Sequence, residues 1–294
     1  MTQPDEQPTG QAGQSGVVDA HQHFWDLSVR DQDWITGPEM APIRRNFSLE
    51  DLEPEARAAG VTATVLVQTV TVAEETPEFL ALAAGSDLVA GVVGWTDLTD
   101  PGIGDTLAAL RALPGGGKLV GIRHQVQGEP DPEWLLRPEV RRGLAAVAEA
   151  GLAYDLVLLP QQLPAAARTA ALLPELTFVL DHLGKPPIAT GDLEPWAHHL
   201  GNLAARPNTF CKLSGMVTEA AWDSWTAEGL RPYADTVLGA FGPGRVMFGS
   251  DWPVSTLAAS YGEVLETART LTDGLSADER TAVFATTARR AYGL

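Results

Sequence analysis

Three histidines and one aspartate follow short apolar stretches of the chain, where strands are expected to end. They are His21, His23, His182 and Asp251. Residues i and i+2 of a strand point to the same side, so His21 and His23 are expected to project together. Imidazoles and a carboxylate that converge from separate parallel strands can hold a divalent metal ion or activate a water molecule. The sequence therefore places its chemistry at the strand ends.

Eight apolar segments rich in β-branched residues alternate with Ala/Leu-rich amphipathic stretches. They predict strands over 17–23, 62–69, 88–94, 119–125, 152–158, 176–182, 208–214 and 245–250. Continuous apolar strands separated by helices indicate a parallel sheet covered on both faces. Eight such units in 294 residues predict a closed (β/α)8 barrel, the TIM barrel. An open doubly wound sheet is the alternative, disfavoured because no Gly-x-Gly-x-x-Gly follows the first strand.

Three regions of the chain are expected to have separate roles. Residues 1–16, rich in Gln, Gly, Pro and Ser, predict a disordered tail. No linker-like break interrupts residues 17–294, which are interpreted as a single barrel domain. Within it, residues 24–47 are too long for an ordinary loop between a strand and a helix, and are expected to fold over the barrel mouth.

The carboxyl ends of all strands in such a barrel meet around one pocket. The side chains expected there are His21, His23, Gln68, Trp95, Arg123, His124, Asp155, His182, Lys212, Ser214, Asp251 and Trp252. A single strand-end histidine is more often structural than functional, but four histidines and an acid at four strand ends favour function. Lys185, in the loop after His182, is interpreted as a loop salt-bridge partner, with a substrate contact as the alternative.

Composition excludes several classes of partner. The net charge of −18 argues against nucleic acid and anionic membranes as partners. No apolar run approaches the roughly 18 residues needed to span a bilayer. Cys211 is the single cysteine, which fits a reducing compartment, and the cytoplasm is the expected location. A homo-oligomer is compatible with the sequence, which does not fix the oligomeric state.

Several ordered motifs resemble the amidohydrolase superfamily. They are VDAHQHFWD, GIRHQVQGEPD, YDLVLLPQQLP, FVLDHLGKP, CKLSGMVTEA and MFGSDWPV, which together run through nearly the whole chain after Gly16. The set is similar to the sugar-lactonase branch of the amidohydrolase-related (amidohydrolase 2) family. This resemblance implies a barrel with the active site at its carboxyl face. It also implies hydrolysis of an aldonolactone of the L-fucono-, L-galactono- or L-rhamnono-lactone type to the aldonic acid.

The resemblance also implies roles for individual residues. His21, His23 and Asp251 match the metal ligands of this family. At most one divalent ion would be held tightly, and Zn²⁺ is the expected ion. Members of this branch differ in whether they use a metal. Asp251 would act as general base and His182 as a second catalytic residue. The substrate would be bound by Trp25, Gln68, Arg123, His124, Lys212 and Trp252.

Two other functions remain open from the sequence. Related carboxylate-lyases use a similar histidine pair and aspartate, so a metal-dependent decarboxylase is the alternative enzyme. Its aromatic substrate would need a dry, aromatic pocket, whereas Gln68, His124, Asp155 and Lys212 are polar and favour a polyol. A non-catalytic sugar-binding barrel is disfavoured, because buried ionisable groups are costly to keep without a function.

Overall fold

Eight parallel strands form one sheet in chain order in the computed structural model, which describes residues 16–294. The predicted tail, apart from Gly16, lies outside the described residues. The strands are β1 (Val17–Gln22), β2 (Val61–Val67), β3 (Val89–Gly94), β4 (Leu119–His124), β5 (Ala153–Leu156), β6 (Phe178–Leu180), β7 (Thr209–Leu213) and β8 (Val246–Phe248). Each is paired in parallel with the next. The predicted (β/α)8 barrel is therefore confirmed.

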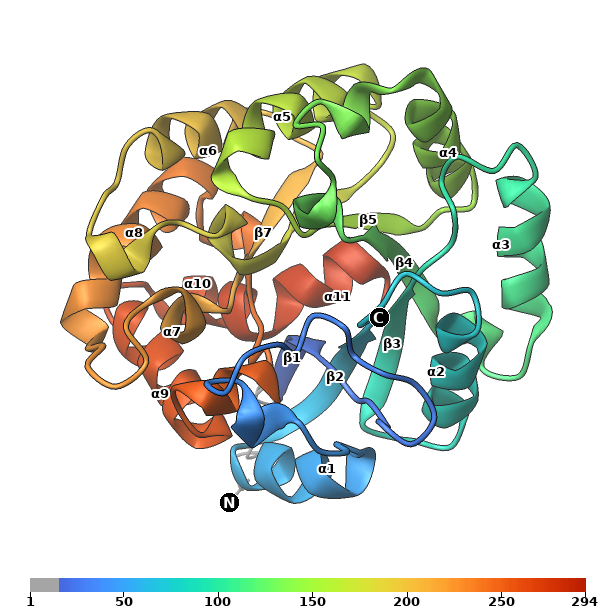
Figure 1. The fold of residues 1–294 in the computed structure, drawn as a ribbon. Coiled ribbons are helices and arrows are strands. Elements are labelled where there is room, and N and C mark those ends of the chain that lie inside the picture. Colours follow the sequence, from blue (N-terminus) through green and yellow to red (C-terminus); the bar gives the residue numbers. More distant parts are fainter. Residues whose placement is uncertain (1–15) are drawn as a thin grey trace, which may run out of the picture.

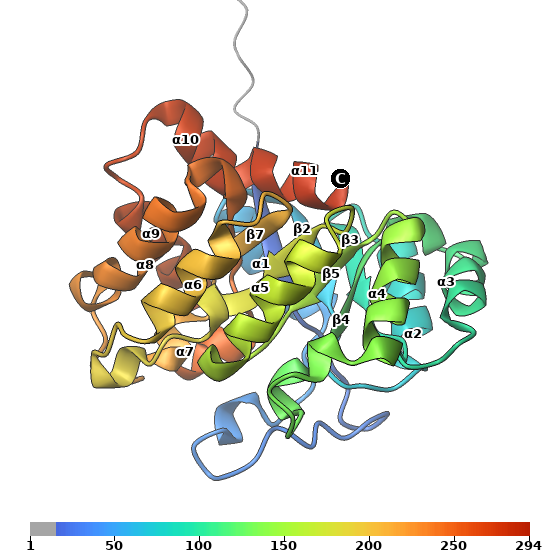
Figure 2. The ribbon, with the colours of Figure 1, turned by 90° about the horizontal axis from the view of Figure 1, so that it is seen from above.

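Helices surround the barrel (Figure 1). They are α1 (Leu49–Ala58), α2 (Glu75–Ala84), α3 (Ile103–Ala112), α4 (Pro138–Glu149), α5 (Leu163–Leu172), α6 (Trp196–Ala204), α7 (Met216–Glu219), α8 (Ala227–Phe241), α9 (Tyr261–Leu271), α10 (Ala277–Thr281) and α11 (Thr287–Tyr292). Figure 2 shows α11 and the segment 24–47 at opposite ends of the barrel. None of the helices in residues 16–294 is both long enough and apolar enough to cross a membrane.

The first helix shows how the sequence sets the element boundaries. Ser48 precedes α1, and its backbone N–H donates to the side chain of Asp51 at 2.9 Å, which forms a capping box. This arrangement satisfies donors that a helix start leaves unpaired. Gly60, just beyond the helix, has φ +81°, a conformation that glycine adopts without steric cost. Ser48 and Gly60 therefore mark the two boundaries of this helix.

The seam between the first and last strands closes the barrel. The N–H of Asp251 donates to the carbonyl of His21 at 2.8 Å, and the N–H of His23 donates to the carbonyl of Trp252 at 2.7 Å. The Asp19 carboxylate joins the same seam, because it accepts from the Ser250 N–H at 2.8 Å and from the Tyr261 hydroxyl at 3.0 Å. The first and last strands of the barrel, which are far apart in the sequence, are thus held side by side.

A bulge in β1 lets Asp19 and His21 face different environments. Between Asp19 and Gln22, three steps along β1 match two along β2, which marks a β-bulge. Asp19 reaches Tyr261 on α9, whereas Ala20 packs inside the barrel with Val65 and other small side chains. Strict alternation would place Asp19 and His21 on the same face. The bulge therefore separates a structural carboxylate from the histidine beside it.

The barrel interior is filled at its amino end and open at its carboxyl end. Small apolar side chains from the strands, Val18, Ala63, Val179 and Met247 among them, pack against Ala288 and Tyr292. Helix α11 therefore plugs the bottom of the barrel. At the other end, segment 24–47 contributes Trp34 and Met40 to the wall of a cavity, as expected for a cover over the mouth.

Candidate active site

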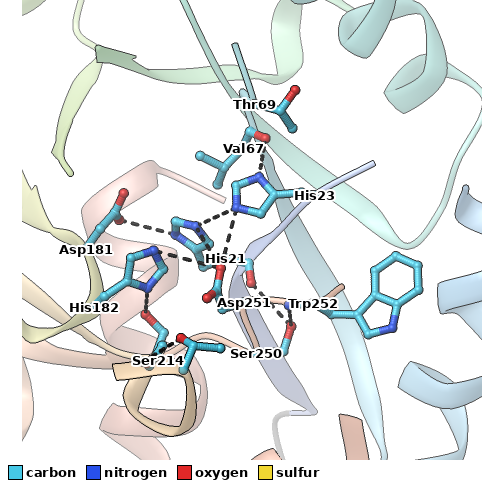
Figure 3. Close-up of polar contacts among 12 residues, drawn as sticks. His21, His23, Val67, Thr69, Asp181, His182, Ser214, Ser250, Asp251 and Trp252 are labelled. Carbon is cyan, nitrogen blue, oxygen red and sulfur yellow. Dashed lines mark hydrogen bonds and ion pairs between the residues drawn. The ribbon is translucent and has the colours of Figure 1, made fainter. Parts of the chain in front are cut away.

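Four side chains converge at the carboxyl end of the barrel (Figure 3). The Nε2 atoms of His21 and His23 lie 3.0 Å apart. Asp251 Oδ1 lies 3.8 Å from His21 Nε2, 3.6 Å from His23 Nε2 and 3.8 Å from His182 Nε2. All four residues are buried or nearly so. The structure therefore brings together the four residues that the sequence singled out, while their roles remain predictions.

His182 and Asp251 reach this centre through turns rather than from the strands themselves. Strand β6 ends at Leu180, two residues before His182, and β8 ends at Phe248, three residues before Asp251. The strand predicted over 176–182 is wrong at this end. His182 has φ +50° and Asp251 has φ +56°, a left-handed conformation that is rare for residues other than glycine. Such strained positions persist where the surroundings hold them, often at functional sites.

Each histidine ring is fixed by a partner of its other nitrogen. His23 Nδ1 lies 2.8 Å from the carbonyl oxygen of Val67. Because a carbonyl only accepts, the proton of His23 sits on Nδ1, and the unprotonated Nε2 can bind a metal ion or accept a hydrogen bond. His182 Nδ1 lies 2.9 Å from Ser214 Oγ. Partners of this kind orient histidines that bind metals or move protons.

Two glycines leave room for the rings. A Cβ atom on Gly215, which has φ +65°, would lie 2.6 Å from His182 Nδ1. A Cβ atom on Gly249 would lie 2.8 Å from His21 Cβ. Both distances are too short for real side chains, so any larger residue would displace a ring. The glycines of the CKLSG and MFGSD motifs therefore belong to the construction of the site.

The environment keeps the histidines neutral and Asp251 ionised. Burial lowers the pKa of His23, and it lowers the pKa of His182 to about 4. Burial also opposes ionisation of Asp251, but interactions with His182 and His23 outweigh it and hold the pKa of Asp251 below its ordinary value. At neutral pH the centre thus combines one carboxylate with imidazoles that can donate a hydrogen bond or ligate a metal ion.

The same side chains fit a divalent metal ion. His21, His182 and Asp251 each offer a ligand atom, and these atoms lie within 4.8 Å of one another. Tetrahedral zinc, with bonds of about 2.0–2.2 Å, separates its ligand atoms by roughly 3.3 Å. The Nε2 atoms of His21 and His23 are 3.0 Å apart, and the three distances from histidine Nε2 to Asp251 Oδ1 are 3.6 to 3.8 Å. These separations are close to the value for tetrahedral zinc. The neutral imidazoles and the carboxylate are also suitable zinc ligands.

A second group of charges lies beneath the centre and is closed to solvent. Lys212 Nζ lies 2.5 Å from Asp155 Oδ2 and 2.9 Å from Asp181 Oδ1, and all three side chains are fully buried. Asp181 also accepts from Arg123 Nη1 at 2.9 Å, and the Tyr292 hydroxyl donates to Asp155. Burial raises the pKa of Asp155 to about 6, whereas the Lys212 charge overcomes burial at Asp181 and holds its pKa well below the usual value.

This buried group supports His21 from below. Asp181 Oδ1 lies 3.2 Å from His21 Nδ1, and Lys212 Nζ lies 3.0 Å from the same atom. Lys212, predicted from its strand-end position to bind substrate, is thus placed under the His21 ring and away from the cavity. Gln68, also predicted to bind substrate, is fully buried and accepts from Arg123 Nε at 2.9 Å. Both are in place to orient their neighbours.

A cavity of about 210 Å³ opens above the centre. Its floor includes His23, His182 and Asp251, and Arg123 reaches its wall, as predicted. The remaining wall comes from several loops and from the cover: Trp34, Met40, Thr69, Gln125, Gln127, Val157, Lys185, Thr218, Glu219, Trp222, Val254 and Leu257. The lining is a mixture of amides, charged groups and aromatic rings.

Three further predicted substrate residues lie behind this wall. His124 is stacked on Trp134 at a centroid distance of 4.4 Å, and its Nε2 lies 2.9 Å from Glu129. Trp25 and Trp252 both pack edge-to-face on Phe47, at 5.3 Å. The sequence interpretation put these rings at the cavity, but in the structure they fix the cover and the loop after β4. Trp34, on the covering segment 24–47, does line the cavity.

Sequence reasoning missed several residues of the site. Asp181 precedes His182 and was not singled out, although its position directly after an apolar strand was a usable signal. Glu219, Trp222, Gln125 and Gln127 follow strand ends by several residues and reach the cavity through loop geometry. Lys185 forms the expected loop ion pair, with its Nζ 3.6 Å from Glu219 Oε1, and it lines the cavity as well.

Comparison with known proteins identifies the family. The family model described as amidohydrolase matches residues 18–294. The chain belongs to the amidohydrolase family. It is 40% identical over 288 residues to the L-fucono-1,5-lactonase of Burkholderia multivorans, covering 94% of this chain and 96% of that protein. It is 39% identical over 246 residues to the L-fucono-1,5-lactonase of Burkholderia ambifaria, covering 84% and 83%.

A solved structure of an amidohydrolase has the same fold as this chain. The zinc-bound crystal structure of an amidohydrolase from Burkholderia multivorans superimposes with a TM-score of 0.90 at 38% identity, covering 95% of this chain and all of that one. This amidohydrolase barrel can therefore hold zinc in a protein similar to this one. The family assignment made from the motifs is confirmed.

Proposed function

We propose that this protein is a lactonase that opens a neutral sugar aldonolactone to its aldonic acid. The observation that carries the proposal is an ionised Asp251 held among three neutral histidines at the floor of a small cavity with a mixed polar and apolar lining. A lactone is an activated ester, so its hydrolysis needs a base for the attacking water and donors for the developing oxyanion. The similarity to L-fucono-1,5-lactonases supports this substrate class.

Asp251 acts as the general base in this proposal. Its lowered pKa keeps it ionised at neutral pH, and Oδ1 takes a proton from water as the water attacks the carbonyl carbon. Asp251 then returns that proton to the ring oxygen when the carbon–oxygen bond breaks. Arg123, at the cavity wall, donates to the carbonyl oxygen as negative charge develops. The neutral His182 orients the water through Nε2.

A zinc ion held by His21, His23, His182 and Asp251 would lower the pKa of the attacking water and polarise the carbonyl. Zinc content after metal loading and thermal unfolding with and without chelator test this assignment. We expect one ion per chain and a fall in Tm on chelation, with both effects lost in His23→Ala. An equal Tm with and without chelator would remove the metal from the proposal, and the hydrogen-bond roles of the histidines would remain.

The cytoplasm and sugar metabolism are the proposed setting. Cys211 is the single cysteine, and burial raises the pKa of its thiol. This pattern is typical of a protein that needs no disulfide.

The decarboxylase alternative fits the cavity less well. Its wall carries amides and an ion pair rather than a dry aromatic surface. A panel of lactones with a pH indicator, beside an assay for carbon dioxide release from aromatic acids, tests the assignment. We expect acid release from L-fucono-, L-galactono- or L-rhamnono-lactone. Carbon dioxide release without lactone hydrolysis would replace the lactonase by a decarboxylase.

A further inference from the structure

One ion pair in the cavity wall lies outside the catalytic centre. Lys185 Nζ lies 3.6 Å from Glu219 Oε1, and both side chains are about three-quarters buried. This separation exceeds the 2.7–3.2 Å of an ordinary hydrogen bond. Glu219 is the only ion-pair partner of Lys185 within residues 16–294. Both side chains therefore retain hydrogen-bonding capacity in a wall that a ligand would touch.

The backbone holds Lys185 in this position. His182, Leu183, Gly184 and Lys185 all have positive φ, between +50° and +71°. A run of left-handed residues is unfavourable for L-amino acids, so the surroundings must stabilise it. The run directs both His182 and Lys185 to the same cavity. The strained turn that delivers a catalytic histidine thus delivers the lysine as well.

We infer that Lys185 and Glu219 bind a hydroxyl group of the sugar lactone and make the enzyme specific for hydroxylated substrates. A hydroxyl can accept from the lysine ammonium and donate to the glutamate carboxylate at once. An oxygen about 2.8 Å from each atom fits over a pair that is 3.6 Å apart. This inference rests on the proposed lactonase function and adds the residues that recognise the substrate.

The charge balance of the cavity agrees with a neutral polyol. The lysine and glutamate charges offset each other, the Arg123 charge is offset by Asp181, and the remaining Asp251 carboxylate disfavours an anionic substrate. Burial raises the pKa of Glu219 in spite of the nearby lysine, so this carboxylate gains from an additional donor. A lactone that lacks hydroxyls would leave both charged groups without that partner.

The test compares two lactones in four proteins. The kcat/KM for L-fucono-lactone is divided by that for δ-valerolactone, which has no hydroxyl, in wild type, Lys185→Met, Glu219→Gln and the double variant. Hydrogen bonds to charged groups contribute about 1.5–3 kcal/mol, so the ratio should fall roughly 10- to 100-fold in each single variant. If both residues bind one hydroxyl, the double variant should fall little further than the single ones.

The control is the exposed ion pair of α1, in which Arg57 Nη2 lies 2.6 Å from Glu53 Oε1. Arg57→Met/Glu53→Gln should leave the ratio unchanged, and thermal unfolding of every variant checks the fold. An unchanged ratio in Lys185→Met and Glu219→Gln, with wild type active, would overturn this inference alone. Failure of wild type to hydrolyse either lactone would overturn the lactonase proposal as well.

Discussion

Asp251 and three other buried aspartates, Asp19, Asp155 and Asp181, differ in what they face. Asp251 faces histidine rings and the cavity, and its distances to those rings leave space for a water or an ion. The other three face donors of the protein itself: backbone N–H groups, tyrosine hydroxyls, Lys212 and Arg123. The same residue type is thus reactive or structural according to whether its lone pairs are already used.

The largest effect is expected for a substitution of Asp251, which faces the cavity, unlike the other three aspartates. Asp251→Asn keeps the size of the side chain, and asparagine tolerates the left-handed backbone at this position. It cannot accept the proton from water, so kcat/KM should fall by about 10³-fold. The free energy of unfolding of the metal-free protein, measured in urea with chelator present, should stay close to that of wild type. Near-normal turnover would take Asp251 out of the mechanism.

Asp181→Asn should affect stability instead. It leaves Arg123 without its carboxylate and Lys212 with only one, and breaking a buried pair typically costs about 3–5 kcal/mol. Urea unfolding measures the loss. Glu266→Gln is the matched control, because Glu266 is paired with Arg269 at 3.3 Å on the surface. Its effect should be below about 1 kcal/mol. Equal effects would contradict the distinction between buried and exposed pairs.

Asp19→Asn should change the pH dependence of stability. Burial raises the pKa of Asp19 from its ordinary value of 3.8 to about 6. Between these values the folded state binds more protons than the unfolded state, so stability falls as pH rises. A difference of about two pKa units is worth about 3 kcal/mol.

Urea unfolding at pH 4.5 and pH 7.5 measures this effect. In Asp19→Asn, the unfolding free energy should fall less between these two pH values than in wild type. At pH 7.5 the variant should therefore gain stability relative to wild type. Parallel pH profiles for the two proteins would show that Asp19 titrates normally.

Tyr292→Phe should have the smallest effect. It removes the hydroxyl that donates to Asp155 and leaves the ring that closes the barrel bottom. The loss of one buried donor to a carboxylate should cost about 1–3 kcal/mol of unfolding free energy. The cavity lies at the other end of the barrel, so KM should not change. A raised KM would mean that the buried cluster transmits its geometry to the cavity.

The sequence was sufficient to predict the barrel and the convergence of His21, His23, His182 and Asp251. The His-x-His pair at a strand end and the later histidine and aspartate predicted a common site, because parallel strands end at one edge. The sequence could not reveal the bulge in β1, because a bulge depends on how the strand pairs with its neighbour. Nor could it show the left-handed turn that carries Lys185. Lys212 and Gln68 were predicted from their strand-end positions to contact substrate. In the structure both are fully buried and do not line the cavity.

Aromatic residues show a related limit. Trp25 and Trp34 lie in the same covering segment, and composition does not distinguish them. Their rings pack edge-to-face at 5.5 Å, and in that pair Trp34 faces the cavity while Trp25 is held by the Arg45 carbonyl. Such assignments depend on the path of an irregular segment, which residue patterns do not specify.

The seam between β1 and β8 has a consequence for how the enzyme gains activity during folding. His21 and His23 come from the first strand, and Asp251 follows the last, so the centre exists only after the most distant parts of the barrel have met. Closing so long a loop is entropically costly and belongs to the slow, non-local part of folding. Recovery of activity after dilution from denaturant should therefore lag behind recovery of helical signal. A chain that ends before β8 lacks Asp251 and the seam, and it should stay inert.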